Sequence, residues 1–101
     1  MKFADTLNTL PGFAGDKLVL TDPAGIEVAT IANAPGTAGS FRVYAYLARQ
    51  YGAIDAEAAT EGLAIFAEHT GDASRHPGKH PNIDRLIAIL TTGIPLNAHI
   101  S

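Results

Sequence analysis

The chain has 101 residues, of which 47% are hydrophobic and 17% are charged, and its formal net charge is −3. The apolar content argues against a disordered protein, and the negative charge argues against a protein whose main task is to neutralise nucleic-acid phosphates. Because the chain has no cysteine, disulfides, thiolate zinc sites, iron–sulfur clusters and cysteine nucleophiles are excluded. A chain of this length needs one hydrophobic core, so we expect a single domain over residues 1–101.

The first segment has apolar residues at helical spacing. Phe3, Leu7 and Leu10 precede a Pro-Gly pair and predict a short amphipathic helix. The first ten residues lack the apolar core of a signal peptide, and the longest aliphatic run, residues 86–90, is too short to span a bilayer. We therefore expect a soluble, cytoplasmic protein that does not enter the membrane.

Two β-rich segments follow, residues 17–21 and 26–31. They flank an Asp-Pro-Ala-Gly sequence, in which proline suits the second turn position and glycine supplies a positive φ, so they predict a β-hairpin. Strict alternation leaves the second face of this hairpin partly apolar, with Val19, Ala29 and Ile31. Such a face predicts an interface.

Three further helices are predicted over residues 40–52, 55–71 and 82–93. Each begins with an N-capping residue type and ends at a glycine. Residues 94–100 then alternate between apolar and other residues, which predicts a short strand that joins the hairpin. The order α-β-β-α-α-α-β is that of a small α+β domain, with a three-stranded, mostly antiparallel sheet packed by helices on one face.

Polar chemistry is concentrated in residues 68–85, here called the histidine segment, which holds three of the four histidines. Its cationic and imidazole groups approach the start of the last predicted helix, where free N–H groups favour phosphate or carboxylate. The segment therefore predicts a site for a small anion. The candidate ligand-binding residues are His69, Arg75, His76, Lys79, His80, Asn82 and Arg85.

The same segment also supports a metal hypothesis, because imidazole and carboxylate groups bind divalent metals. The candidate ligands are His69, Asp72, His76 and His80. Proline and glycine prevent His76 and His80 from sharing a helix face, although a type II turn at Pro77-Gly78 would bring them together again. Lys79 would repel a cation. We expect no cofactor and keep a divalent metal as the alternative, beside the simpler interpretation that the segment is a solvated connection.

Residues 33–40, here called the glycine-rich loop, join a strand to a helix, which is the setting of phosphate-binding loops. The loop lacks the G-K-[ST] ending of a P-loop and the G-x-G-x-x-G pattern, so an ordinary connection with a helix cap explains it as well. Asp72, Ser74 and His76 are triad residue types, but no G-x-S-x-G motif presents the serine. We identify no catalytic residues.

Three stretches are similar to one family, namely Ala34–Ser40, Phe66–Thr70 and Pro77–Leu86. They resemble the bacterial family called domain of unknown function 2322, and the likeness covers most of the chain. The resemblance implies a small bacterial protein and supplies neither an activity nor catalytic residues.

Two hypotheses about function follow. The first is a non-catalytic protein that self-associates, as a dimer, through its weakly charged surface and partly apolar sheet face. The second is a protein that binds a small anion or a metal through the histidine segment, with His76 or His80 as a general acid or base if it is an enzyme. Convergence of His69, His76 and His80 near the start of the last helix would favour the second hypothesis.

Overall fold

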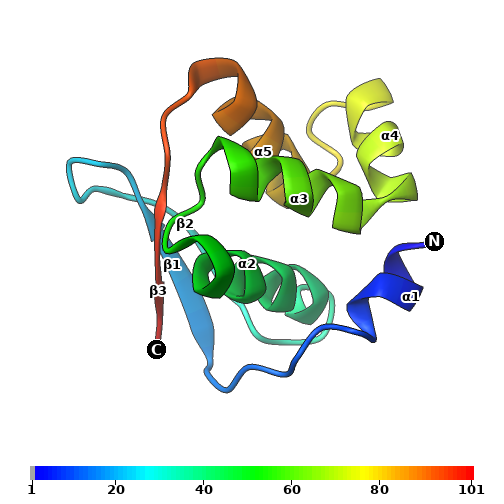
Figure 1. Cartoon of the computed structure of the whole chain (residues 1–101), viewed down its shortest axis with the longest axis horizontal. Coiled ribbons are helices and arrows are strands. Elements are labelled where there is room, and N and C mark those ends of the chain that lie inside the picture. Colours follow the sequence, from blue (N-terminus) through cyan, green and yellow to red (C-terminus); the bar gives the residue numbers. More distant parts are fainter. Residues whose placement is uncertain (1) are drawn as a thin grey trace.

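The computed structural model describes residues 2–101 and confirms the predicted α+β fold. Its sheet has the strand order β2-β1-β3, and both pairs of strands are antiparallel. The strands are β1 (Lys17–Thr21), β2 (Glu27–Ala32) and β3 (Asn97–Ile100). The helices are α1 (Phe3–Leu7), α2 (Ala38–Tyr51), α3 (Ala56–Phe66), α4 (Glu68–Arg75) and α5 (Pro81–Thr92). All of them lie on one side of the sheet (Figure 1).

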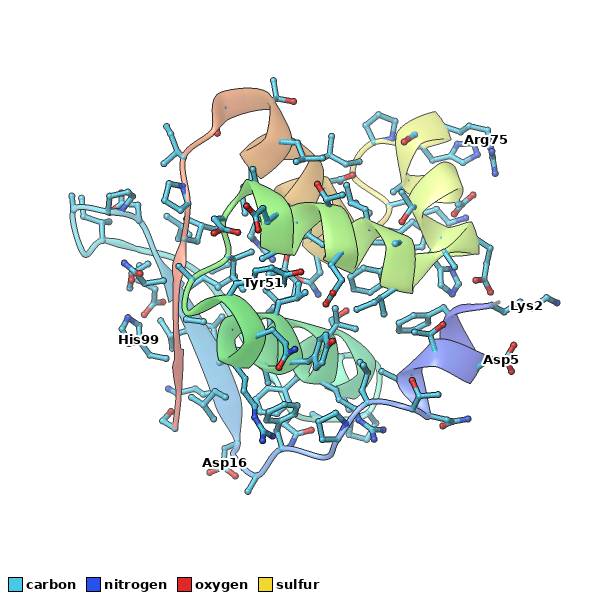
Figure 2. All side chains as sticks on the ribbon, in the orientation of Figure 1. Lys2, Asp5, Asp16, Tyr51, Arg75 and His99 are labelled. Carbon is cyan, nitrogen blue, oxygen red and sulfur yellow. The ribbon has the colours of Figure 1, made fainter. Side chains whose placement is uncertain are left out.

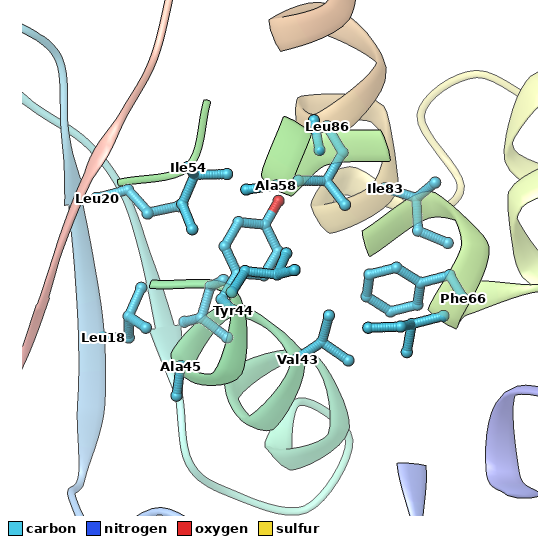
Figure 3. Packing of buried hydrophobic residues seen from close by; sticks show 14 of the residues in the cluster. Leu18, Leu20, Val43, Tyr44, Ala45, Ile54, Ala58, Phe66, Ile83 and Leu86 are labelled. Carbon is cyan, nitrogen blue, oxygen red and sulfur yellow. The ribbon is translucent and has the colours of Figure 1, made fainter. Parts of the chain in front are cut away.

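The core lies between the sheet and the stacked helices. α2 contacts all three strands, and α3 lies between α2 and α5. Leu18 and Leu20 of β1 meet Tyr44 of α2 in this layer (Figure 3), and all three are fully buried. At Gly62 of α3, an added Cβ would lie 2.8 Å from Leu47 Cδ1 and 2.8 Å from Leu86 Cδ1. Glycine therefore allows α3 to approach both neighbouring helices closely.

The predicted hairpin is confirmed, and Asp22 closes the turn between its two strands. The Gly25 N–H donates to the Asp22 carbonyl oxygen at 2.9 Å, and Asp22 Oδ1 accepts from the N–H groups of Ala24 and Ile26, each at 2.9 Å. Gly25 has a φ of 86°. The side chain of Asp22 thus fixes the turn that the sequence predicted.

The prediction that Val19, Ala29 and Ile31 share an outer face is wrong. Ile31 pairs with Leu18, faces the helices and is only 2% exposed. Val19 pairs with Thr30 and His99 on the opposite face, where His99 projects away from the helices (Figure 2). The apolar outer face on which the self-association hypothesis was based is therefore not present.

A β-bulge at Val28 changes the alternation that the sequence suggested. Leu20 pairs with Ala29 whereas Thr21 pairs with Glu27, so that Val28 is the extra residue of β2. A bulge of this kind redirects the side chains that follow it. Val28 lies beside α5 and is 50% exposed, as part of a shallow groove with Ala88, Thr92 and Ile94.

The helix predicted over residues 55–71 is two helices, α3 and α4. The chain breaks at Ala67, which has a φ of 49° and a ψ of −114°, and not at Gly71, which lies within α4. Thr70 Oγ1 donates to the Leu63 carbonyl oxygen at 2.6 Å and ties α4 back to α3. Residues 72–75 of the histidine segment are thus helical, where we had expected a loop.

The helix starts also differ slightly from the prediction. Thr37 and His80 are the N-cap residues of α2 and α5, in place of Ser40 and Asn82. Pro81 occupies the first position of α5, where a missing N–H has no cost. Within residues 2–101, no helix has the length and hydrophobicity needed to cross a membrane.

Candidate functional site

Two Pro-Gly turns, each directly before a helix, define the candidate site. In the first, before α2, the Thr37 N–H donates to the Ala34 carbonyl oxygen at 3.0 Å, and Gly36 has a φ of 92°. In the second, before α5, the Lys79 N–H donates to the His76 carbonyl oxygen at 3.1 Å, and Gly78 has a φ of 94°. A positive φ at the third turn position is the requirement of a type II turn, so proline and glycine explain both turns.

These turns bring the glycine-rich loop and the histidine segment to one pocket of about 370 Å³, here called the α2–α5 pocket. Its polar lining residues are Thr37, Ser40, His69, Lys79, His80 and Asn82. The two segments that the sequence suggested separately as phosphate sites therefore line one pocket.

The starts of α2 and α5 both leave backbone N–H groups available at this pocket. Neither helix has a side chain bonded to its first turn as a cap, since Thr37 Oγ1 donates instead to the Ala32 carbonyl oxygen at 2.7 Å. Among the described residues, the N–H groups of Ser40 and Asn82 have no acceptor. The positive ends of two helices are thus open to an anion.

The start of α5 is held in place by the core. The buried Tyr44 hydroxyl donates to the Asn82 carbonyl oxygen at 2.5 Å, and Arg85 Nη1 donates to Asn82 Oδ1 at 2.8 Å. Burial raises the pKa of Tyr44 to about 12, against the opposing effect of Arg85. Because the Asn82 side chain is occupied by Arg85, the backbone N–H is the group of Asn82 that is left for a ligand.

Asp72 connects three residues of the histidine segment. Its Oδ2 lies 2.7 Å from His80 Nε2 and 2.9 Å from Lys79 Nζ, and its Oδ1 lies 3.9 Å from His76 Nε2. The hydrogen bonds from His80 and then Lys79 hold the pKa of Asp72 well below its usual range. Because an ionised carboxylate only accepts, His80 Nε2 carries a proton. His80 Nδ1 is then the ring nitrogen left to contact a ligand.

Aromatic rings form another part of the pocket. Phe3 stacks on Phe66 with a centroid distance of 5.1 Å, and its ring meets the His69 ring edge-on at 5.4 Å. The rings of His69 and His80 are 5.7 Å apart. The Phe3 N–H donates to Glu68 Oε1 at 2.7 Å, and this hydrogen bond is the main cause of the lowered pKa of Glu68. The N-terminal helix is thereby fixed beside α4.

The structure brings together four of the predicted ligand-binding residues, namely His69, Lys79, His80 and Asn82, at the pocket. The other three, Arg75, His76 and Arg85, do not line it. The His76 side chain is 60% exposed, Arg75 lies at the outer side of α4 (Figure 2), and Arg85 is directed over the Tyr44 ring.

The predicted metal ligands are only partly assembled. Asp72 lies near His76 and His80, but its Oδ2 already accepts from His80 and Lys79. Across residues 2–101 no group of three or more histidines and carboxylates is placed to hold a metal ion. The arrangement is better suited to an anion, because Lys79 already pairs with the Asp72 carboxylate that a metal cation would need.

Sequence reasoning did not assign Phe3 or Phe66 to this site, and it placed Gly36, Thr37 and Ser40 in a separate candidate phosphate loop. The Pro-Gly pair before a helix was a signal for the last three, since it marks a turn that can lead to an open helix start. Phe3 reaches the pocket only through the packing of α1 against α2 and α3, for which the sequence gives no local signal.

Comparisons with known proteins place the chain in a family without assigning an activity. Neither the curated proteins nor the solved structures give a match. The model of a family described as an uncharacterized protein conserved in bacteria (DUF2322) matches residues 3–100, in agreement with the resemblance seen in the sequence. The chain therefore belongs to the DUF2322 family.

Proposed function

We propose that this protein binds a small anion, a phosphate or a carboxylate, in the α2–α5 pocket. The observation that carries the proposal is the convergence of two uncapped helix starts with Lys79, His69 and His80 on one pocket. Backbone N–H groups at a helix start, together with a lysine ammonium, are the donors that anions use in proteins.

The strength of binding can be estimated from these donors. Each helix start contributes about 0.3–1 kcal/mol, and one hydrogen bond from a charged donor contributes about 1.5–3 kcal/mol. Their sum of about 2–5 kcal/mol corresponds to a Kd for inorganic phosphate between roughly 0.2 and 30 mM. Asp72 opposes the anion, but its charge is balanced by Lys79.

Isothermal titration calorimetry with inorganic phosphate at pH 6 and low ionic strength tests the proposal. We expect millimolar binding that weakens about tenfold in Lys79→Met, because one charged donor is lost. Lys17→Met is the matched control, since Lys17 is an exposed lysine of β1 that does not line the pocket. Equal weakening by both substitutions, or no binding to the wild type, would contradict the proposal.

We also propose self-association through a surface other than the one the sequence suggested. Val28 and Ile94, which are 50% and 52% exposed, line the shallow groove between the bulge of β2 and the end of α5, and Ile26 at the hairpin tip is 63% exposed. Neighbouring apolar side chains with this exposure favour a contact with another protein surface.

Native mass spectrometry of the untagged protein tests this second proposal. A dimer at micromolar concentration that becomes a monomer in Val28→Glu is the expected result, because the charge would be buried in the contact. Leu90→Glu serves as the control, since Leu90 is 44% exposed but does not line this groove. A monomeric wild type would refute the proposal.

A further inference from the structure

We infer that the ligand of the α2–α5 pocket is an aromatic anion, a phosphate monoester or carboxylate whose ring lies against Phe3 and His69. The inference rests on the proposed function, because it assumes that the anionic group binds at the starts of α2 and α5. It extends that function by assigning the chemical class of the ligand.

The volume of the pocket exceeds what a simple anion needs. About 370 Å³ lies at the lower end of the range for pockets that hold organic ligands, about 300–1,000 Å³. A water molecule takes about 30 Å³ in the liquid, so a phosphate or carboxylate group with its few heavy atoms leaves most of the pocket unfilled. The remaining volume therefore fits an organic group attached to the anion.

The rings beside the pocket indicate what kind of organic group this is. Phe66, Phe3, His69 and His80 follow one another with centroid distances of 5.1, 5.4 and 5.7 Å. Phe66 is only 3% exposed and supports Phe3 from behind, whereas Phe3 and His69 are partly exposed at the pocket. Aromatic rings contact one another favourably at these distances, so an aromatic group on the ligand can contact Phe3 and His69 in the same way.

The two kinds of lining come from different parts of the fold. The helix starts of α2 and α5 supply Thr37, Ser40 and Asn82, while α1 and α4 supply Phe3 and His69. A ligand with an anionic group at one end and an aromatic ring at the other matches both kinds of lining. Phe3 is held for this contact by its N–H bond to Glu68 Oε1 and by its stacking on Phe66.

Calorimetric titrations with phenyl phosphate, methyl phosphate and inorganic phosphate test the inference on the full chain. We expect phenyl phosphate to bind about tenfold more tightly than methyl phosphate, and benzoate and acetate to show the same order if the group recognised is a carboxylate. Phe3→Ala removes the preference, so that phenyl phosphate binds no more tightly than methyl phosphate, while Phe3→Leu keeps part of the preference. Leu7→Ala is the control, because Leu7 also lies on α1 and is partly buried but does not line this pocket.

The outcomes separate this inference from the proposed function. If inorganic phosphate binds and neither aromatic compound binds more tightly than its methyl counterpart, the inference is overturned and anion binding stands. A preference for the aromatic compounds that persists in Phe3→Ala also overturns it. If none of these anions binds, the proposed function fails, and the inference fails with it.

Discussion

Tyr44 joins the core to the candidate site, and its hydroxyl group allows a quantitative test. The side chain is fully buried, its hydroxyl donates to the Asn82 carbonyl oxygen at 2.5 Å, and Arg85 Nη1 lies 3.4 Å from the hydroxyl oxygen. Tyr44→Phe keeps the ring and removes only the hydroxyl. Because Arg85 retains its bond to Asn82 Oδ1 and the carbonyl group keeps its partner in the helix, the cost at pH 7 is about 1 kcal/mol.

The same hydroxyl makes this cost depend on pH. The pKa of Tyr44 is raised by burial to about 12 in the folded state, against about 10 in the unfolded chain. A raised pKa means that the stabilisation by the neutral hydroxyl is complete below about pH 10 and is lost as the pH rises through the folded-state value. By pH 11 about 1.4 kcal/mol is lost, which removes the advantage of the wild type over Tyr44→Phe.

Urea unfolding of both proteins, followed by circular dichroism at pH 7 and pH 11, measures this difference. Comparing the two proteins at each pH cancels the titration of the lysines and the other tyrosines. If the difference in free energy of unfolding between the wild type and Tyr44→Phe stays constant from pH 7 to pH 11, the burial of the hydroxyl is refuted. If Tyr44→Phe lowers the free energy of unfolding by about 3 kcal/mol or more at pH 7, the hydrogen-bond partners of the Tyr44 hydroxyl are left unsatisfied.

Three further predictions concern Asp72, Ala67 and Gly62. Because its pKa is lowered, Asp72 stabilises the fold above about pH 4 and loses this effect progressively as the pH falls toward its folded-state value, so Asp72→Asn lowers the thermal midpoint more at pH 6 than at pH 2. Ala67→Gly relieves an unfavourable φ of 49° and raises the free energy of unfolding in urea by about 1 kcal/mol, after the entropy cost of glycine is included. Gly62→Val lowers that free energy by about 1–3 kcal/mol, because the added carbons overlap Leu47 and Leu86; equal stability would show that α3 can move away.

The parts of the fold that follow local rules could be predicted from the sequence. The spacing of apolar residues identified α2 and α5, and the Asp-Pro-Ala-Gly sequence identified the hairpin turn. The Pro77-Gly78 pair correctly predicted a turn, and this turn brings His80 back to Asp72, which His76 also approaches. In each case the residues concerned are close in sequence, so the physical cause is visible without the fold.

The features that the sequence missed depend on contacts between distant residues. Alanine normally continues a helix, so nothing at Ala67 signalled the break between α3 and α4, whereas Gly71 looked like a helix end and is tolerated inside one. The bulge at Val28 depends on the pairing of β2 with β1, and it overrode the simple alternation of side chains.

The residues of the candidate site divide in the same way, into those that local sequence predicts and those that only the packing of distant elements brings together. His69, Lys79, His80 and Asn82 were predicted because they lie in one polar segment, and the pocket contains them. That Thr37 and Ser40 lie across the same pocket depends on the packing of the helices, which no local pattern encodes. Proximity in sequence also suggested Arg75 and His76, but the structure directs them elsewhere.

The central claim is that an anion binds at the starts of α2 and α5, and residue-specific NMR tests it most directly. Inorganic phosphate is added to the 15N-labelled protein while the backbone amide signals are followed. We predict that the largest saturating shifts occur at the amides of Ser40 and Asn82, which have no acceptor among the described residues, and at Lys79. Shifts that are absent from these amides, or that follow exposed lysines such as Lys17 instead, would contradict the account.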